Sequence, residues 1–155
     1  MAPPYHQTLL SKSVTEIMSQ GAMHVLLESA KIMKPNSGCT IIIVASTAGL
    51  DGLPGQGAFT ASMHGVVGLV RSMAKELGPR NIRVNCVAPS ICDSSNNTPS
   101  GDETAESEIS NGMAKMSIGM GEDPLEVAKV AAFLLSDESH SVTGSVLTIN
   151  SGLVT

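Results

Sequence analysis

Three short apolar runs, separated by helical patterns, constrain the fold of this chain more than any other feature. They cover residues 40–45, 82–87 and 145–150. The first, TIIIVA, is β-branched at most positions and apolar on both faces. That pattern is typical of a parallel strand that helices cover on both sides. We therefore predict three buried strands of a parallel sheet.

Helical patterns precede and separate these runs. We expect helices over residues 13–33 and 57–77, the second ending at a Gly-Pro pair, and a third helix that begins after Asp123. Asp123 is a preferred N-cap residue, and Pro124 suits the first helical position. Alternating helices and strands predict an α/β fold with right-handed crossovers.

The length of 155 residues corresponds to one domain, residues 1–155. We expect residues 1–12 to form an N-terminal arm. Residues 93–116 are polar and rich in Ser, Asn and Glu, and we expect a lid-like loop after the second strand. Ligands bind beyond the carboxyl ends of strands in such sheets. A solvated surface insertion without function is an equally good interpretation.

Composition excludes several classes of function. A net charge of −5, one Tyr, two Phe and no Trp argue against nucleic-acid binding. The apolar runs are too short for a membrane helix, and the N-terminus lacks the pattern of a secretory signal. Cys39, Cys86 and Cys92 form no CxxC pair, and no metal-site spacing appears with the histidines. We therefore expect no metal, no disulfide and a cytoplasmic location.

Two segments carry a resemblance to a known family. Residues 38–90, including IIIVASTAG and LGPRNIRVNCVAPS, resemble the middle of a short-chain dehydrogenase/reductase, and residues 133–152 resemble its C-terminal end. The resemblance extends over about residues 13–155. It implies the C-terminal half of a doubly wound, Rossmann-like sheet with about three core strands. Such enzymes usually transfer hydride between alcohols and ketones, using NAD(H) or NADP(H) and an Asn-Ser-Tyr-Lys tetrad.

The sequence departs from that tetrad at three of four positions. Ser46 stands at the position of the Ser, but Phe59 stands at the position of the Tyr and Met63 at that of the Lys. Met18 stands at the position of the Asn. A phenyl ring cannot donate a proton to a carbonyl, and a thioether cannot lower a neighbour's pKa. Phe59 and Met63 are one helical turn apart and would form an apolar wall.

The family's phosphate-binding turn is also missing from the sequence. No G-x-G-x-x-G motif is present among the 15 glycines, and the resemblance begins after that element. The resemblance therefore implies an N-terminally truncated member without a cofactor. We expect that the chain by itself does not transfer hydride.

The same positions predict a site for an apolar small molecule. Ser46 and Thr47 are the candidate catalytic residues, which would polarise a substrate oxygen, although for Ser46 a role as a turn cap is an equally good interpretation. The candidate substrate-binding residues lie where the resemblance places the wall, the mouth and the lid of the active site: Met18, Phe59, Met63, Pro89, Ser90, Cys92, Met113 and Met116. No residue is expected to bind a cofactor.

The first strand is expected to lie at an edge of the sheet, because the strand that pairs with it in the family has no counterpart here. A flat, β-branched edge promotes aggregation unless it is covered. The N-terminal arm or a second chain would cover it, and we favour the second chain. Because family members associate through the corresponding helices, we expect a homodimer through helices 13–33 and 57–77, with the sheets or arms as further contacts.

Three functions are open from the sequence. The first, which we favour, is a cofactor-independent, redox-neutral enzyme (a cyclase, isomerase or lyase) that shapes an apolar small molecule in secondary-metabolite biosynthesis. The second is a non-catalytic subunit that binds an intact short-chain dehydrogenase. The third, a product without a selected role, is disfavoured because the helix caps, the strand patterns and the segment LGPRNIRVNCVAP are intact.

Overall fold

The computed structural model describes residues 8–90, 117 and 123–153. Within them, three strands form one parallel sheet in the order β1-β2-β3: β1 (Thr40–Val44), β2 (Arg83–Pro89) and β3 (Val146–Ile149). All three strands fall where the apolar runs predicted them. The α/β fold is therefore confirmed, with β1 at one edge of the described sheet.

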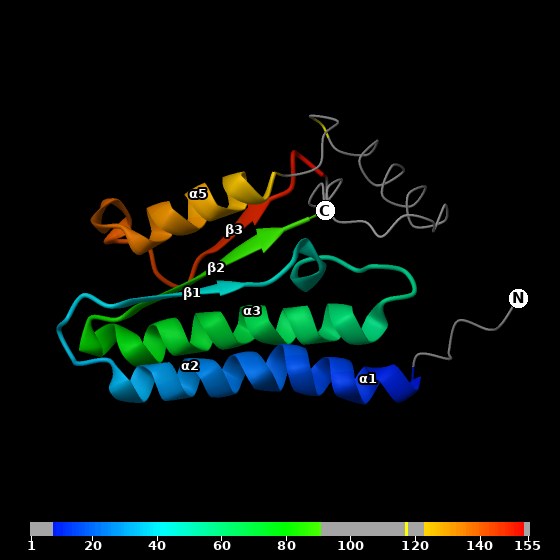
Figure 1. Ribbon diagram of the computed structural model, residues 1–155, viewed down its shortest axis with the longest axis horizontal. Helices are drawn as coiled ribbons and strands as arrows, with labels where there is room; N and C mark the ends of the chain where they lie inside the picture. The colour runs from blue at the N-terminus through cyan, green and yellow to red at the C-terminus, as the bar shows by residue number, and fades with distance from the viewer. Residues whose placement is uncertain (1–7, 91–116, 118–122, 154–155) are drawn as a thin grey trace, which may run out of the picture.

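Helices cover both faces of this sheet (Figure 1). On one face lie α1 (Thr8–Thr15), a π-helical segment η2 (Glu16–Gln20), α2 (Gly21–Ile32) and α3 (Gly57–Leu77). On the other face lies α5 (Pro124–Leu135). Short 3₁₀ turns follow β1, α3 and α5, as η3 (Thr47–Gly49), η4 (Gly78–Arg80) and η5 (Asp137–Ser139). No helix among the described residues has the length and hydropathy needed to cross a bilayer.

The first helix starts earlier than its sequence pattern predicted. It begins at Thr8 rather than at residue 13, so residues 8–12 of the expected N-terminal arm are helical. The helix is also divided, because η2 interrupts it with a π-helical turn. The run had no proline and no strong N-cap to mark its start, so periodicity alone did not fix this boundary.

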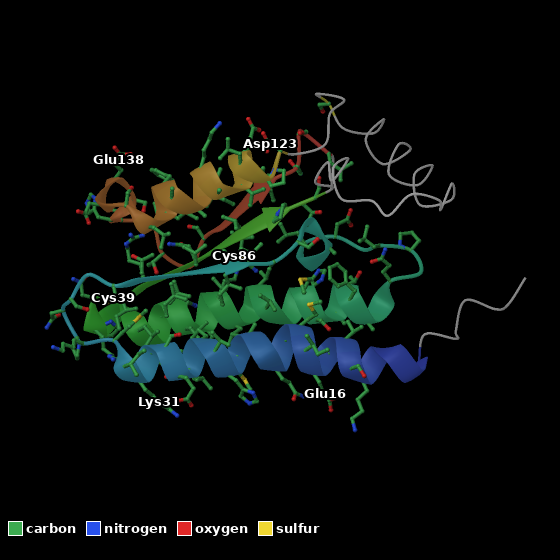
Figure 2. The ribbon with its side chains drawn as sticks, viewed as in Figure 1. Glu16, Lys31, Cys39, Cys86, Asp123 and Glu138 are labelled. Carbon is green, nitrogen blue, oxygen red and sulfur yellow. The ribbon has the colours of Figure 1, made fainter. Side chains whose placement is uncertain are left out.

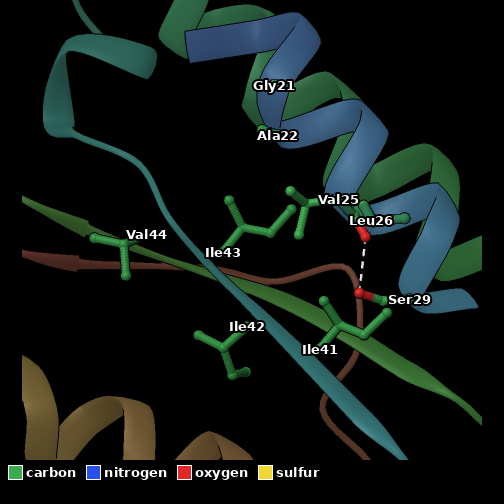
Figure 3. A pocket seen from close by; sticks show the side chains of 9 residues that line it. All are labelled: Gly21, Ala22, Val25, Leu26, Ser29, Ile41, Ile42, Ile43 and Val44. Carbon is green, nitrogen blue, oxygen red and sulfur yellow. Dashed lines mark hydrogen bonds between the residues drawn. The ribbon is translucent and has the colours of Figure 1, made fainter. Parts of the chain in front are cut away.

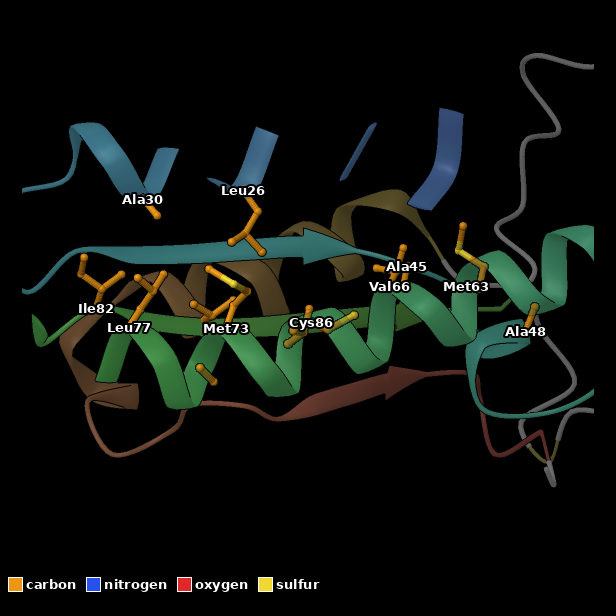
Figure 4. Close-up of a cluster of buried hydrophobic side chains, with 13 residues drawn as sticks. Leu26, Ala30, Ala45, Ala48, Met63, Val66, Met73, Leu77, Ile82 and Cys86 are labelled. Atoms are coloured by element: carbon orange, nitrogen blue, oxygen red, sulfur yellow. The ribbon is translucent and has the colours of Figure 1, made fainter. Parts of the chain in front are cut away.

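The core lies between the sheet and the helices α2 and α3 (Figure 4). Leu26 and Ala30 of α2 belong to the same cluster of buried side chains as Val66 and Val70 of α3. Strand β2 contributes the fully buried Val84 and Cys86. Charged side chains remain outside: Glu16 and Lys31 project from the outer side of the helices in Figure 2, where Cys86 lies inside. β2 is buried on both faces, and its buried Asn85 has partners there: the side chain donates to the Val142 carbonyl at 2.8 Å and accepts from the Ser145 N–H at 3.1 Å.

Helix α5 begins as its sequence predicted. The Asp123 carboxylate accepts a hydrogen bond from the Leu125 backbone N–H at 2.8 Å, and Pro124 occupies the first turn. This cap satisfies one of the N–H groups that a helix start leaves without a partner.

The C-terminal end of α5 is held by one side chain of β2. The Arg83 guanidinium donates to the carbonyl oxygens of Leu134, Ser136 and Val142, at 3.0, 3.2 and 3.3 Å. It also donates to the Ser139 hydroxyl at 3.1 Å. These carbonyls belong to the end of α5 and the turn after it, where a helix lacks partners of its own. Arg83 therefore fixes α5 onto the sheet.

We predict that Arg83→Met lowers the free energy of unfolding by about 3 kcal/mol, because it leaves several partly buried carbonyls without donors. Arg83→Lys is expected to recover only part of this loss, since an ammonium lacks the forked geometry of the guanidinium. Urea unfolding followed by circular dichroism measures both values. Arg71→Met, at an exposed position of α3, is the control and is expected to change stability by less than about 0.5 kcal/mol. Equal effects at both positions would contradict this role of Arg83.

Candidate functional site

The candidate residues that follow β1 and β2 lie at one edge of the sheet. Ala45 continues the β1–β2 ladder, because its N–H donates to the Val87 carbonyl at 2.9 Å. Ser46 and Pro89 are therefore neighbours at the carboxyl ends of adjacent strands. The Ser90 N–H donates to the Ile149 carbonyl at 3.0 Å, which ties this edge to β3 as well. The structure places the candidates where ligands bind in parallel sheets.

Ser46 caps the turn that follows β1. Its backbone is extended, with φ −152° and ψ 158°, and its hydroxyl oxygen accepts a hydrogen bond from the Ala48 N–H at 3.2 Å. Ser46 is half-buried, whereas Thr47 is buried with 7% of its surface exposed. The capping role weighed from the sequence is thus present in the structure. The hydroxyl hydrogen of Ser46 stays available, since the cap uses only the oxygen.

The turn η3 packs directly onto α3. A Cβ added to Gly49 would lie 2.8 Å from the carbonyl oxygen of Met63, so only glycine permits this approach. Met63 has 5% of its surface exposed and belongs to the core, and Phe59 is half-buried against the same core cluster. Met63 lies against η3 and Phe59 one turn earlier on α3, and the weakly accepting sulfur of Met63 is the one polar atom in these two side chains.

Met18 lies in the π-helical segment η2, which packs against α3. It has 40% of its surface exposed. Ser19 donates its hydroxyl to the Thr15 carbonyl at 2.8 Å, and the buried Ser62 of α3 donates to the Thr15 hydroxyl at 3.5 Å. π-Helical turns are common at functional sites. The sequence analysis did not predict this turn, which has no reliable sequence signal.

Three candidates fall outside the described residues: Cys92, Met113 and Met116. The expected lid, residues 93–116, also lies outside them. Their contacts with a substrate remain predictions. No cluster of three or more His, Cys, Asp or Glu able to bind a metal occurs in the described part of the chain.

A groove lies away from Ser46, between α2 and the outer edge of β1. This groove has a volume of about 280 Å³, and its lining is almost entirely apolar: Gly21, Ala22, Val25, Leu26, Ser29, Ile41, Ile42, Ile43 and Val44 (Figure 3). Sequence reasoning placed β1 at an edge but did not predict the groove. The spacing of Ala22, Val25 and Ser29 on one helix face was the available signal.

The fold and these positions define a class: a Rossmann-like α/β protein of the dehydrogenase type. The family model described as enoyl-(acyl carrier protein) reductase matches residues 9–154. The chain therefore belongs to the short-chain dehydrogenase/reductase family. It is 37% identical to the 3-oxoacyl-[acyl-carrier-protein] reductase FabG of Thermotoga maritima over 142 residues, covering 92% of this chain and 56% of the relative.

Further similarities agree with this assignment. The chain is 34% identical to the short-chain dehydrogenase/reductase aba4 of Botryotinia fuckeliana, covering 85% of this chain and 51% of the relative. A solved structure of 4-hydroxyisoleucine dehydrogenase complexed with NADH superposes with a TM-score of 0.82 and 25% identity, covering 95% of this chain and 60% of that one. The chain thus spans about half the length of the curated relatives it matches.

Two of the described residues do not fit the NADH that is present in that solved structure. At the nicotinamide end, Phe59 and Met63 are neutral and apolar, so they offer neither a proton nor a charged donor to a ribose hydroxyl. We therefore derive no step through this cofactor.

We predict that Gly49→Ala destabilises the fold by about 2 kcal/mol, because the new Cβ meets the backbone of α3 rather than a flexible side chain. Thermal unfolding by circular dichroism measures the change. Gly52→Ala is the matched control, since nothing lies within 4 Å of a Cβ at that position. If both variants unfold at the wild-type temperature, the close packing of η3 on α3 is refuted.

The cysteines differ in reactivity for a physical reason. Burial raises the pKa of the Cys86 thiol to about 11, against a smaller opposite effect of its hydrogen bond with the Ala45 backbone. At pH 9 we expect iodoacetamide to alkylate the half-buried Cys39 well before Cys86 in the folded protein, as peptide mapping would show.

The same shift predicts a pH dependence of stability. From about pH 9 to pH 11 the folded state keeps a proton on Cys86 that the unfolded chain loses. The free energy of unfolding therefore falls as the pH rises through this window, and Cys86→Ala is expected to fall less steeply. Equal slopes for the two proteins, or equal alkylation rates at Cys39 and Cys86, would contradict the burial of this thiol.

Proposed function

We propose that this chain is a catalytically silent member of the short-chain dehydrogenase/reductase family that acts by binding an intact reductase of the same family. One observation carries the proposal: Phe59 and Met63 lie one turn apart on α3, beside the turn that holds Ser46. They stand where the family resemblance places the proton donor and its lysine partner. The positions are structured, but the side chains cannot move a proton.

Without a proton donor or a base from Phe59 and Met63, Ser46 has a smaller catalytic capacity. Its hydroxyl oxygen accepts from the Ala48 N–H, and Phe59 and Met63 supply no base. A serine without a base is not an effective nucleophile, and a hydroxyl without an acidic neighbour is a weak proton donor. Ser46 therefore acts as the cap of η3, and the activity of the complex comes from the partner reductase.

The outer side of α3 supports association through helices. Along it runs a stripe of small, exposed residues at helical spacing: Gly57, Ala61, Gly65, Gly68 and Ser72. Nothing lies within 4 Å of a Cβ added to Gly68. Exposed Ile17 and Leu27 lie on the neighbouring helix. A smooth stripe flanked by apolar side chains lets a second pair of helices approach closely, as in a four-helix bundle. A homodimer through this face, helices 13–33 and 57–77, is part of the same proposal.

A second candidate function is a cofactor-independent cyclase, isomerase or lyase. The half-buried Ser46, which follows β1, and the half-buried Phe59 of α3 favour it, since an apolar wall and one hydroxyl suit the folding of an apolar substrate into a reactive shape. A bound small molecule that Ser46→Ala releases, with no protein partner, would favour this function over the first.

The test is coexpression of the full chain with an intact family reductase from the same source, followed by native mass spectrometry. We expect a mixed complex, and we expect the chain alone to consume no NADPH with a 3-oxoacyl thioester. Gly68→Arg is expected to weaken the complex at least tenfold, whereas Gly52→Arg, in an exposed loop, leaves it intact. If no mixed complex forms, the proposed binding to a reductase is wrong. If the chain alone consumes NADPH, the proposed loss of catalytic activity is wrong.

A further inference from the structure

Asn36 lies in the turn that leads from α2 into β1, at the amino ends of the strands (Figure 1). Its backbone is left-handed, with φ 59°, a conformation that asparagine adopts more readily than most residues. The Asn36 N–H donates to the Arg80 carbonyl at 2.8 Å, which ties the turn to η4. The Asn36 side chain is exposed and has no hydrogen-bond partner among the described residues. Its amide carbon is therefore open to attack.

The backbone nitrogen of Ser37 is the neighbouring group that can attack this carbon. In a tight turn, such an N–H often donates to the carbonyl three residues earlier. Here the Ser37 hydroxyl takes that place, because it donates to the Lys34 carbonyl at 2.6 Å. The Ser37 N–H itself has no partner in the part of the chain that the structure describes. No hydrogen bond between described residues has to break before this nitrogen reacts.

From this arrangement we propose that Asn36 is a site of spontaneous deamidation in the folded protein. Asparagine is among the thermolabile side chains. The Ser37 nitrogen loses its proton and bonds to Cγ of Asn36, the Cγ–Nδ2 bond breaks, and ammonia leaves with a proton. The product is a cyclic succinimide, which water opens at either of its carbonyls to give aspartate or isoaspartate. Water is consumed and ammonia released, and nothing is oxidised or reduced.

Two other described asparagines are protected from this reaction. Asn85 is fully buried, and its side-chain amide both donates and accepts hydrogen bonds. Asn81 is exposed and left-handed like Asn36, with φ 57°. The nitrogen that follows it, however, belongs to the buried Ile82 and donates to the Leu77 carbonyl at 3.3 Å. Attack by that nitrogen requires the end of α3 to open first.

Asn150 offers a matched comparison, because a serine follows it as well. Ser37 and Ser151 both have an N–H without a partner among the described residues. The two asparagines differ in their side chains, since the Asn150 amide is half-buried and donates to the Leu153 carbonyl at 2.9 Å. This hydrogen bond has to open before Asn150 reacts, which is expected to slow its deamidation about fivefold.

Deamidation changes both the charge and the length of the turn. The new carboxylate lies just beyond the C-terminal end of α2, where a helix disfavours negative charge. Isoaspartate also adds a methylene to the main chain, next to the N–H that bonds Arg80. The Arg80 guanidinium donates to the Ala30 and Met33 carbonyls at 2.8 and 2.6 Å, so the same residue holds the end of α2. We therefore expect the deamidated protein to unfold at a lower temperature.

The test is incubation of the full chain at about 37 °C and pH 8, with and without urea, followed by peptide mapping. Mass spectrometry detects the exchange of an amide NH2 for OH at each asparagine. In the folded protein we expect Asn36 to react about fivefold faster than Asn150, and in urea we expect equal rates. Asn111, which a glycine follows in the sequence, is the positive control, because a glycine nitrogen is the least hindered. Equal rates at Asn36 and Asn150 in the folded protein overturn the proposal, as does an Asn36 that reacts only in urea.

Asn36→Gly tests the effect on the fold, because glycine accepts the left-handed backbone and has no amide to lose. We expect its unfolding temperature to fall less during the incubation than that of the wild type. Asn81→Gly, at the other left-handed asparagine, is the matched control and is expected to fall as the wild type does. An equal fall in Asn36→Gly and the wild type would contradict the effect of Asn36 on this turn.

Discussion

The fold depends on one strand that is paired on both sides and covered on both faces. β2 lies between β1 and β3, and its five inner residues are fully buried. A strand in that position requires helices above and below it, and its buried side chains must be apolar or, like Asn85, fully hydrogen-bonded. Arg83 at the start of β2 adds a specific link, because its guanidinium satisfies the end of α5. The remaining elements are arranged around this strand.

The candidate site shows how a fold can persist while its chemistry changes. β1, η3 and α3 bring Ser46, Phe59 and Met63 to the same end of the sheet, with Gly49 permitting the close contact. The geometry comes from backbone packing and would accept other side chains at positions 59 and 63. Acid-base chemistry instead depends on the particular side chains, and here they are apolar. The fold is kept while the side chains for proton transfer are replaced, and this supports our proposal that the chain acts by binding a reductase.

β1 lies at an edge of the described sheet, beside a groove with an apolar lining. β1 carries the most β-branched sequence of the three strands, yet it lies at the edge of the described sheet. Its apolar character fits a strand that pairs on both sides. Apolar residues are also exposed on α2, beside the groove, where Val25 and Ile32 face outward. Each of these residues gains stability only when another chain segment covers it.

Local patterns in the sequence determined much of this structure. The strands, the limits of α3 and the cap of α5 at Asp123 follow from side-chain periodicity and turn residues, which act within a few positions of the chain. The replacement of the proton relay by Phe59 and Met63 is likewise visible in the sequence. The early start of α1, the π-helical turn at Met18 and the groove along β1 were decided by tertiary structure. They depend on contacts between elements distant in sequence, and no local pattern encodes the space that packing leaves open.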